Sequence, residues 1–396
     1  MKKWTAIWLL LLAELLSMAV WFSASAVSPA LASAWRLDDA GQAWLTMSVQ
    51  AGFVAGALTS ALLNLSDRWP SHVVFAWSAV GAGAATAAIA AAAHGLAPAA
   101  VLRFLTGFLL AGVYPVGMKI VATWTTQDRG LGIGLLVGAL TLGSAGPQLL
   151  NALGAARNWN EAGDWKMLLY VASACAAAGG LIAALFVREG PDRAPSNTAV
   201  PFRWSYAGAI LRDRPVLLAN LGYLGHMWEL YAMWAWIAAY VGSSAVAFVA
   251  IAAGAPACVL AGKLADQIGR TTVTIASMAI SGACALAIGW FYHAGFAALT
   301  AIAILWGFAV VADSAQFSAC VSELGSREHL GTALTLQTSL GFLLTMFTIR
   351  LVPLMQARIG TQWSFSVLAL GPAAGIVAMI ALRRHPAAVR IAGGRR

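Results

Sequence analysis

Residues 14–21 read ELLSMAVW and residues 229–236 read ELYAMWAW, so that Glu, Leu, Met and Trp recur 215 positions apart. A second echo joins LSDR at residues 65–68 to GKLADQIGR at residues 262–270, with the shared Asp 199 positions apart. A third joins Gly107-Phe108 to Gly307-Phe308 at a separation of 200. Repetition near half the chain length indicates a duplicated unit. In a membrane protein, such halves usually meet around a central solute path.

The composition places the chain in a lipid bilayer. Hydrophobic residues make up 60% of it, charged residues make up 10%, and the mean hydropathy is +0.77. One soluble core could not hide so much apolar surface. Twelve apolar stretches approach the length of about 20 residues with which a helix crosses a bilayer. These predicted spans are 5–27, 42–63, 72–93, 98–122, 130–153, 166–187, 216–241, 243–262, 271–292, 296–319, 331–353 and 364–383.

The repeat and the charges predict the domain organisation and the topology. We expect an N-terminal six-helix bundle at 1–187, a cytoplasmic linker at 188–214, and a C-terminal six-helix bundle with a short basic tail at 215–396. With the N-terminus inside, seventeen Lys and Arg residues fall in inner segments and four in outer loops. This positive-inside bias predicts that both termini are cytoplasmic. The net charge of +9 is therefore explained by the orientation of the chain in the membrane, and nucleic acid is not an expected partner.

Two features of the sequence need a separate interpretation: the N-terminal segment, which resembles a signal peptide, and the four cysteines, which could suggest a disulfide or a metal site. The first span begins like a secretory signal peptide, but it contains Glu14 and matches span seven, so we interpret it as a retained span. All four cysteines fall inside predicted spans and lack the spacing of metal ligands, so we expect no disulfide, no metal site and no cofactor. The four are Cys175, Cys258, Cys284 and Cys320.

Residues 262–270 resemble the cytoplasmic loop signature of the major facilitator superfamily, Gly-x-x-x-Asp-Arg-x-Gly-Arg, although Gln267 replaces the usual Arg. The span count, the symmetry and the linker extend the resemblance over the whole chain. It implies an all-α membrane protein with the superfamily fold, in which twelve transmembrane helices form two pseudo-symmetric six-helix bundles. An Asp in such a loop can cap a helix and bind an Arg, which favours a conformational latch over a solvated turn. The predicted latch residues are Asp67, Arg68, Gly262, Asp266, Gly269 and Arg270.

Charged residues inside the membrane are the main candidates for function, because each costs about 2.5–3.5 kcal/mol at mid-bilayer. Six Lys, Arg, Asp or Glu residues fall within the predicted spans. Five of these lie on spans one, four, seven and ten, which the resemblance implies line the central cavity. The six are Glu14, Arg103, Lys119, Glu229, Asp313 and Arg350.

Helix periodicity groups these residues with others. At 3.6 residues per turn, Glu14 shares a face with Trp21, and Glu229 shares the equivalent face with His226 and Trp236. We predict that the two carboxyl groups face the cavity as a pseudo-symmetric pair that binds protons or substrate. The alternative is a neutral Glu that is hydrogen-bonded between helices. Asp313, in the inner half of span ten, is predicted to be a further proton carrier or substrate ligand.

Arg103 resembles the arginine on span four that is associated with proton coupling in the superfamily. It could pair with Glu14, attract an anion, or reach the outer headgroups. Lys119 is expected to reach the inner headgroups. A mixture of aromatic and polar side chains suits an organic solute. The predicted cavity-lining residues are Trp21, Tyr114, Trp236, Tyr240, Trp306, Gln316 and Gln337.

The sequence therefore predicts a secondary transporter of a small organic solute, which works by alternating access and is coupled to protons. Exchange is favoured over symport because the glycine-rich span five, ending at Gly146-Pro147, resembles the antiporter signature of drug/proton exchangers. The alternatives are an uptake porter for a small anion such as nitrate or cyanate, and a non-transporting sensor. Spans two and eight lack the arginines of nitrate porters, and a sensor would need an added soluble domain.

The remaining expectations concern class, partners and location. The sequence contains no enzyme motif and no phosphate-binding loop, so neither an enzyme nor a primary pump is predicted. The expected partners are a small-molecule substrate, protons and the lipid bilayer, and the expected state is a monomer in a bacterial-type inner membrane. Substrate identity, direction and stoichiometry are left open.

Overall fold

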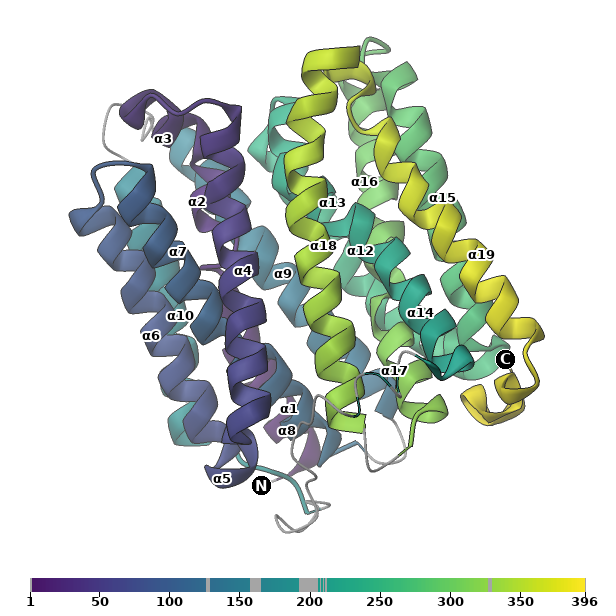
Figure 1. Cartoon of the computed structure of the whole chain (residues 1–396). Coiled ribbons are helices and arrows are strands. Elements are labelled where there is room, and N and C mark those ends of the chain that lie inside the picture. The colour runs from purple at the N-terminus through teal and green to yellow at the C-terminus, as the bar shows by residue number, and fades with distance from the viewer. Residues whose placement is uncertain are drawn as a thin grey trace.

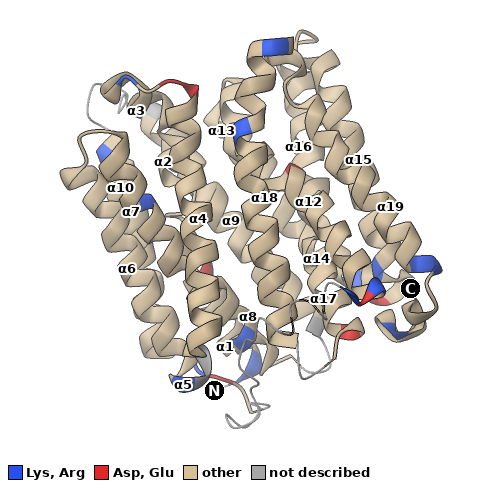
Figure 2. Cartoon of the chain, viewed as in Figure 1, with Lys and Arg blue, Asp and Glu red and all other residues tan. Residues whose placement is uncertain are grey.

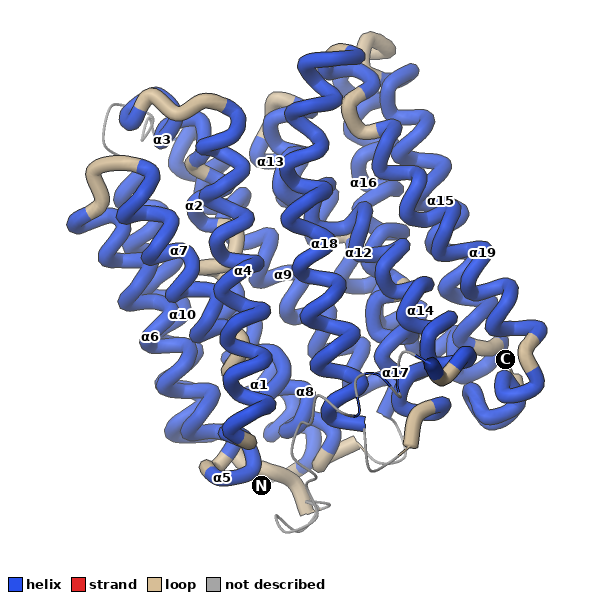
Figure 3. The backbone as a smooth tube through the Cα atoms, viewed as in Figure 1, coloured by secondary structure: helices blue, strands red, loops and turns tan. Residues whose placement is uncertain are grey.

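Helices make up the regular structure of the part of the chain that the computed structural model describes (Figure 3). The side chains of 66, 67, 129, 155 and 156 lie outside this description. The described residues are 2–125, 129–156, 165–191, 206, 208, 210, 212–326 and 330–395.

The first half of the chain forms one group of helices, coloured purple to teal in Figure 1. Within it, α10 packs along α6 and α4 packs along α7. The elements are α1 (Lys3–Met18), α2 (Ser23–Ala26), α3 (Ser28–Trp35), α4 (Asp39–Leu63), α5 (Leu65–Arg68), α6 (Ser71–Ala92), α7 (Leu96–Leu110), α8 (Tyr114–Ala122), α9 (Arg129–Ala156) and α10 (Trp165–Phe186).

The second half forms a second group, coloured teal to yellow in Figure 1. The groups meet where α4 packs on α18 and where α9 packs on α13 and α14. The elements are α12 (Arg214–Val241), α13 (Ser244–Ala252), α14 (Gly254–Ile268), α15 (Arg270–Phe291), α16 (Phe296–Ala312), α17 (Ser314–Leu324), α18 (Leu330–Ile359), η3 (Thr361–Trp363), η4 (Ser366–Ala369), α19 (Leu370–Arg384) and η5 (Pro386–Gly394).

Both chain ends lie at the same end of the molecule, which we call the terminal face; the other end is the opposite face (Figure 1). Lys and Arg gather at the terminal face (Figure 2). In the described residues, ten helical stretches have the length and hydropathy to cross a membrane. The two other predicted spans correspond to the interrupted pair α1 and α2 and to α12, whose 28 residues are long enough to cross.

Four predicted spans consist of two α-helices rather than one. Span one stops at Met18 and resumes at Ser23, and span four is broken between Leu110 and Tyr114. Span eight changes helix at Ala253, and span ten changes helix at Asp313. Pro115, at the start of α8, accounts for the second break because proline cannot donate a backbone hydrogen bond and clashes with the preceding turn. Hydropathy does not register such breaks, since the interrupted segments stay apolar.

The prediction that residues 262–270 form a loop is largely wrong. Helix α14 continues through Ile268, so most of the signature is helical. Lys, Leu, Ala and Asp at 263–266 are compatible with a helix, and the chain turns only at Gly269, whose φ of +96° suits glycine. Asp266 therefore projects from a rigid helix end, not from a flexible turn.

The echo between Gly107 and Gly307 reflects the same helix contact in both halves. A Cβ atom on Gly107 would lie 2.0 Å from the carbonyl oxygen of Val49, and a Cβ atom on Gly307 would lie 1.9 Å from that of Ala250. Each glycine thus lets two helices, α4 with α7 and α13 with α16, approach to backbone contact. The repeated sequence corresponds to a repeated packing site.

Candidate functional site

Glu229 lies at the centre of the second group, on α12. Its side chain is 1% exposed. Ser281 of α15 donates a hydrogen bond of 2.8 Å to one carboxyl oxygen, and the Trp306 indole of α16 donates one of 2.6 Å to the other. The carboxyl group thereby connects three helices in a place that excludes water. Trp306, predicted to line the cavity, is instead fully buried as a partner of Glu229.

His226 and Asp313 form a second polar pair close by. His226 precedes Glu229 by about one turn of α12, and its Nδ1 lies 2.9 Å from Oδ1 of Asp313. Asp313 occupies the junction between α16 and α17, where the helix break brings its carboxyl group toward α12. The other ring nitrogen of His226 has no hydrogen-bond partner among the described residues. The structure thus brings three of the predicted coupling residues onto adjacent helices.

Glu14 occupies the equivalent place in the first group, but its surroundings differ. Its side chain is fully buried, and neither carboxyl oxygen has a hydrogen-bond partner among the described residues. The carboxyl group faces α8, where a Cβ atom on Gly117 would lie 2.9 Å from Oε2. Tyr114 of the same helix lies within electrostatic range of Glu14. An unpaired carboxylate in such a place is costly, and binding a proton relieves that cost.

Arg103 is placed differently from two of the three expectations. It is fully buried, so it does not reach headgroups, and its hydrogen bonds go to backbone carbonyls rather than to Glu14. Nε donates to Leu45 of α4 at 3.1 Å, and the two terminal nitrogens donate to Val20, at 2.8 Å, and to Trp21. Val20 and Trp21 lie in the break between α1 and α2. Arg103 thus satisfies carbonyls that the interrupted helix leaves open.

An aromatic cluster joins the two groups at this break. The Trp21 ring contacts Phe53 of α4 at 5.0 Å between centroids, Tyr231 of α12 at 5.9 Å and Phe342 of α18 at 5.5 Å. Phe53 and Phe342 contact each other at 4.5 Å. Trp21 is 1% exposed. The cluster fills the space between the groups, so Trp21 closes the predicted path here rather than lining an open cavity.

Three of the other predicted lining residues, Trp236, Tyr240 and Gln337, have partners within the second group. The Trp236 indole donates to the Ile349 carbonyl at 2.9 Å, and the Tyr240 hydroxyl donates to the Gln362 carbonyl at 2.7 Å. Gln337 accepts from Ser318 at 3.2 Å.

The predicted latch is built around Arg270. Its guanidinium group donates to Glu323 of α17 at 2.7 Å and to the side-chain oxygen of Gln316 at 2.8 Å, and it lies 3.5 Å from the Asp266 carboxylate. Gln316 therefore belongs to this cluster rather than to a cavity wall. Glu323 was not among the predicted residues, because it lies beyond residue 319, where predicted span ten ends.

Asp266 also reaches the first group. A Cβ atom on Gly130 would lie 2.6 Å from its carboxylate, and one on Gly262 would lie 3.1 Å from the Gly130 carbonyl. Gly130 belongs to the first turn of α9, where a negative charge interacts favourably with the helix dipole. In the first copy of the motif, Arg68 is exposed and the Asp67 side chain lies outside the described residues.

The basic tail folds back onto the latch. The Ala392 backbone N–H donates to Glu323 at 3.0 Å, and the side chains of Arg390 and Arg395 donate to the carbonyls of Leu324 and Asp266. The sequence suggested no protein partner for this tail. Its docking depends on carbonyls that are left open at helix ends, which a sequence does not reveal.

The sequence and fold that hold these buried carboxyl groups and the predicted latch resemble those of known proteins. The sequence model of the Major Facilitator Superfamily matches residues 10–257. The chain belongs to the Major Facilitator Superfamily. It is accordingly a multi-pass membrane protein of a transporter family.

The chain is also similar to individual proteins. The MFS transporter prlL of a fungal species (strain NRRL 50135) is 26% identical over 128 residues. The match spans 32% of this chain and 25% of that relative. The human organic anion transporter MFSD10 (TETRAN) superposes with a TM-score of 0.69 at 18% identity, covering 96% of this chain and 100% of that one.

A bacterial homologue of the human lysosomal transporter Spinster, in an inward-facing and unoccupied conformation, superposes with a TM-score of 0.67 at 17% identity. It covers 96% of this chain and 95% of that one. At these identities the two superpositions show a shared fold.

Proposed function

We propose that this facilitator moves a small organic solute by alternating access and couples the movement to protons, with exchange favoured over symport. The proposal includes twelve spans in two bundles, at 1–187 and 215–396, with both termini on the cytoplasmic side of a bacterial-type inner membrane. The bias of Lys and Arg toward the terminal face supports this orientation.

One observation carries the proton coupling. Glu14 is a fully buried carboxyl group without a hydrogen-bond partner among the described residues. Its repeat equivalent, Glu229, has two donors, so the two halves hold their carboxyl groups with unequal strength. A group that needs a proton in one state and loses it when water reaches it in another would couple proton movement to alternating access.

The position of Arg103 speaks against a small-anion porter. Each nitrogen of its guanidinium group donates a hydrogen bond to a backbone carbonyl, so the group is poorly placed to bind an anion. Glu14 and Glu229, the carboxyl groups nearest mid-span, would also repel an anion when charged.

Reconstituted protein tests the proposal. A panel of labelled organic solutes is offered to proteoliposomes with and without an imposed pH gradient, and the gradient should concentrate or expel one of them. Glu14→Gln removes the titrating group with little change in shape, and it should abolish the response to the gradient while solute exchange at equal pH continues. Concentration of the solute by Glu14→Gln under the gradient would contradict the assignment.

Glu229→Gln is the companion variant, because it removes the titrating group at the repeat equivalent of Glu14. Melting temperatures of each purified variant show whether a loss of transport reflects unfolding. If Glu229→Gln loses the response to the pH gradient while Glu14→Gln keeps it, the proton-coupling role belongs to Glu229 and not to Glu14.

A further inference from the structure

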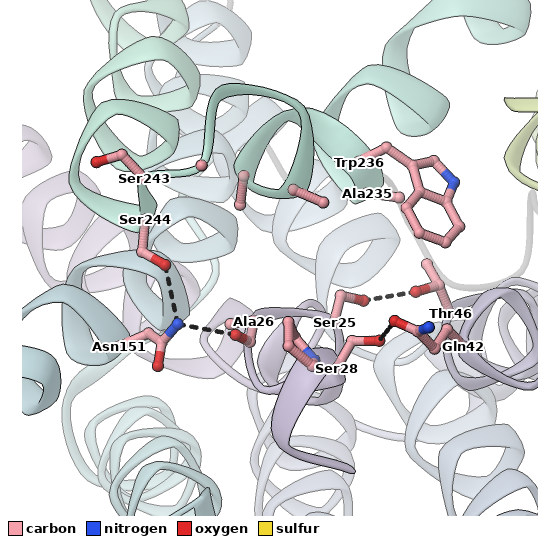
Figure 4. A pocket seen from close by; sticks show the side chains of 14 residues that line it. Ser25, Ala26, Ser28, Gln42, Thr46, Asn151, Ala235, Trp236, Ser243 and Ser244 are labelled. Atoms are coloured by element: carbon pink, nitrogen blue, oxygen red, sulfur yellow. Dashed lines mark hydrogen bonds between the residues drawn. The ribbon is translucent and has the colours of Figure 1, made fainter. Parts of the chain in front are cut away.

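A cavity of about 270 Å³ lies between the two groups of helices (Figure 4). Its walls include α2, α3 and α13, which lie toward the opposite face (Figure 1). Its walls come from α2, α3, α4 and α9 of the first group and from α12 and α13 of the second. Asn151 of α9 spans the divide, because its amide nitrogen donates to the Ala26 carbonyl at 2.9 Å and to the Ser244 hydroxyl at 2.8 Å.

The lining combines hydroxyl and amide side chains with alanine, proline and tryptophan, and it is uncharged. Among the described residues that form it, none is Asp, Glu, Lys, Arg or His. Hydroxyl and amide side chains pair across the floor: Ser25 and Thr46 lie 2.5 Å apart, and Ser28 donates to the Gln42 side-chain oxygen at 2.9 Å (Figure 4). A charged solute would leave its water shell here and find no opposite charge.

Hydrogen-bonding capacity remains free around the cavity. The amide nitrogen of Gln42 and the amide oxygen of Asn151 have no partner among the described residues. The Ser244 oxygen accepts from Asn151, which leaves its own proton to donate. A purely apolar solute would leave these groups unsatisfied, whereas a hydroxyl group can both donate to them and accept from them.

Trp236 supplies a fixed aromatic wall. Its indole N–H donates to the Ile349 carbonyl of α18 at 2.9 Å, which holds the ring in place at one end of the cavity (Figure 4). The ring face can pack against the C–H groups of a solute while the hydroxyl and amide groups bind its polar edges.

The cavity also lies next to the barrier formed by the aromatic cluster. Trp21 and Phe22 come just before Ser25, and Tyr231 and Trp234 come just before Trp236. The cavity and the aromatic cluster are therefore neighbours along the chain in both groups, within a few residues of each other.

We propose that this cavity is an outer loading site for a small, uncharged polyhydroxylated solute. The substrate class of the transporter would then be neutral polyhydroxylated compounds, and this inference rests on the proposed function. The volume is slightly below the range of roughly 300–1,000 Å³ that holds drug-sized ligands, so it suits a solute the size of a six-carbon polyol.

Three six-carbon probes of matched size test the charge selectivity: sorbitol, which is neutral, gluconate, which is an anion, and glucamine, which is a cation. Saturation-transfer NMR on the full chain in detergent should show contact with sorbitol and at least a five-fold weaker signal for each charged probe. Equal signals for gluconate or glucamine would overturn the proposal.

Paired variants locate the contact. Thr46→Val and Ser28→Ala each remove a hydroxyl group from the cavity, and each should weaken the sorbitol signal several-fold. Thr59→Val is the matched control on the same helix, because the Thr59 hydroxyl bonds only to the Ala55 carbonyl outside the cavity. A sorbitol signal that Thr46→Val and Thr59→Val change equally would place the contact elsewhere and overturn the assignment.

Transport of the same probes separates this proposal from the proposed function. If proteoliposomes move a charged probe while sorbitol never binds, the loading site is wrong and the transporter role stands. If sorbitol binds in the cavity but no organic solute responds to any gradient, the site stands and the proposed function is wrong.

Discussion

Arg103 shows how the meaning of a single charge depends on its neighbours. On the sequence it is one positive charge at the outer part of span four, and an acid on span one is its natural partner. In the structure its guanidinium group instead meets three carbonyls, two of them from the break between α1 and α2. Each of its three nitrogens has a carbonyl acceptor, which offsets part of the cost of burying the charge.

Arg103→Lys tests this role. A lysine keeps the charge, but its compact ammonium group cannot bind the Leu45 carbonyl and the two carbonyls of the break in the same fork geometry. We expect a loss of about 1.5–3 kcal/mol in the free energy of unfolding, measured by thermal or denaturant unfolding in detergent. Arg358→Lys, at an exposed position, is the control. Equal stability of the two variants would assign Arg103 a different role.

At the scale of elements, the glycine contacts explain why the two halves share a sequence. Gly107 and Gly307 each bring two helices to backbone contact, so any larger residue must push the helices apart. Small residues of this kind recur in sequence without revealing which helix they face.

We expect Gly107→Ala and Gly307→Ala to destabilise the protein by about 3 kcal/mol or more, because the added methyl group would meet a carbonyl oxygen on a rigid backbone. Gly146→Ala is the matched control, since a Cβ atom there has no neighbour within 4 Å. The yield of folded protein on size-exclusion chromatography, followed by melting temperatures, measures the difference. Wild-type behaviour of Gly107→Ala would mean that α4 and α7 are less tightly packed than described.

At the scale of the whole molecule, the latch joins the two groups at the terminal face. Asp266 contacts the first turn of α9 in one group, while Arg270 and Glu323 hold the helix ends of the other. The docked tail adds its own hydrogen bonds to this cluster. The same structure therefore combines contact at the terminal face with a cavity toward the opposite face.

Asp266→Asn should loosen this contact, because it removes the negative charge from the N-terminus of α9. Spin labels at the exposed residues Leu62 on α4 and Leu264 on α14 report the separation of the groups at the terminal face. We expect the distance distribution to shift toward longer values. Lys263→Gln, which changes a neighbouring exposed charge, should leave the distribution unchanged; a shift of equal size in that control would count against a specific latch.

The sequence by itself determined the family, the duplicated halves, the distribution of basic residues and the identity of the buried acids. These follow from hydropathy, repetition and the high cost of charge in lipid, all of which are properties of local composition. Glu14, Glu229 and Asp313 could be named in advance because few charged residues lie inside the spans.

Only the tertiary structure decided what those residues contact. It gave Glu229 two donors and Glu14 none, moved Arg103 onto backbone carbonyls, and turned Trp21 into part of a closed aromatic cluster. The physical reason is that hydrogen bonds and ring contacts depend on distances of a few ångströms between separate helices. Helix breaks and the rotation of each helix set those distances, and neither leaves a trace in hydropathy.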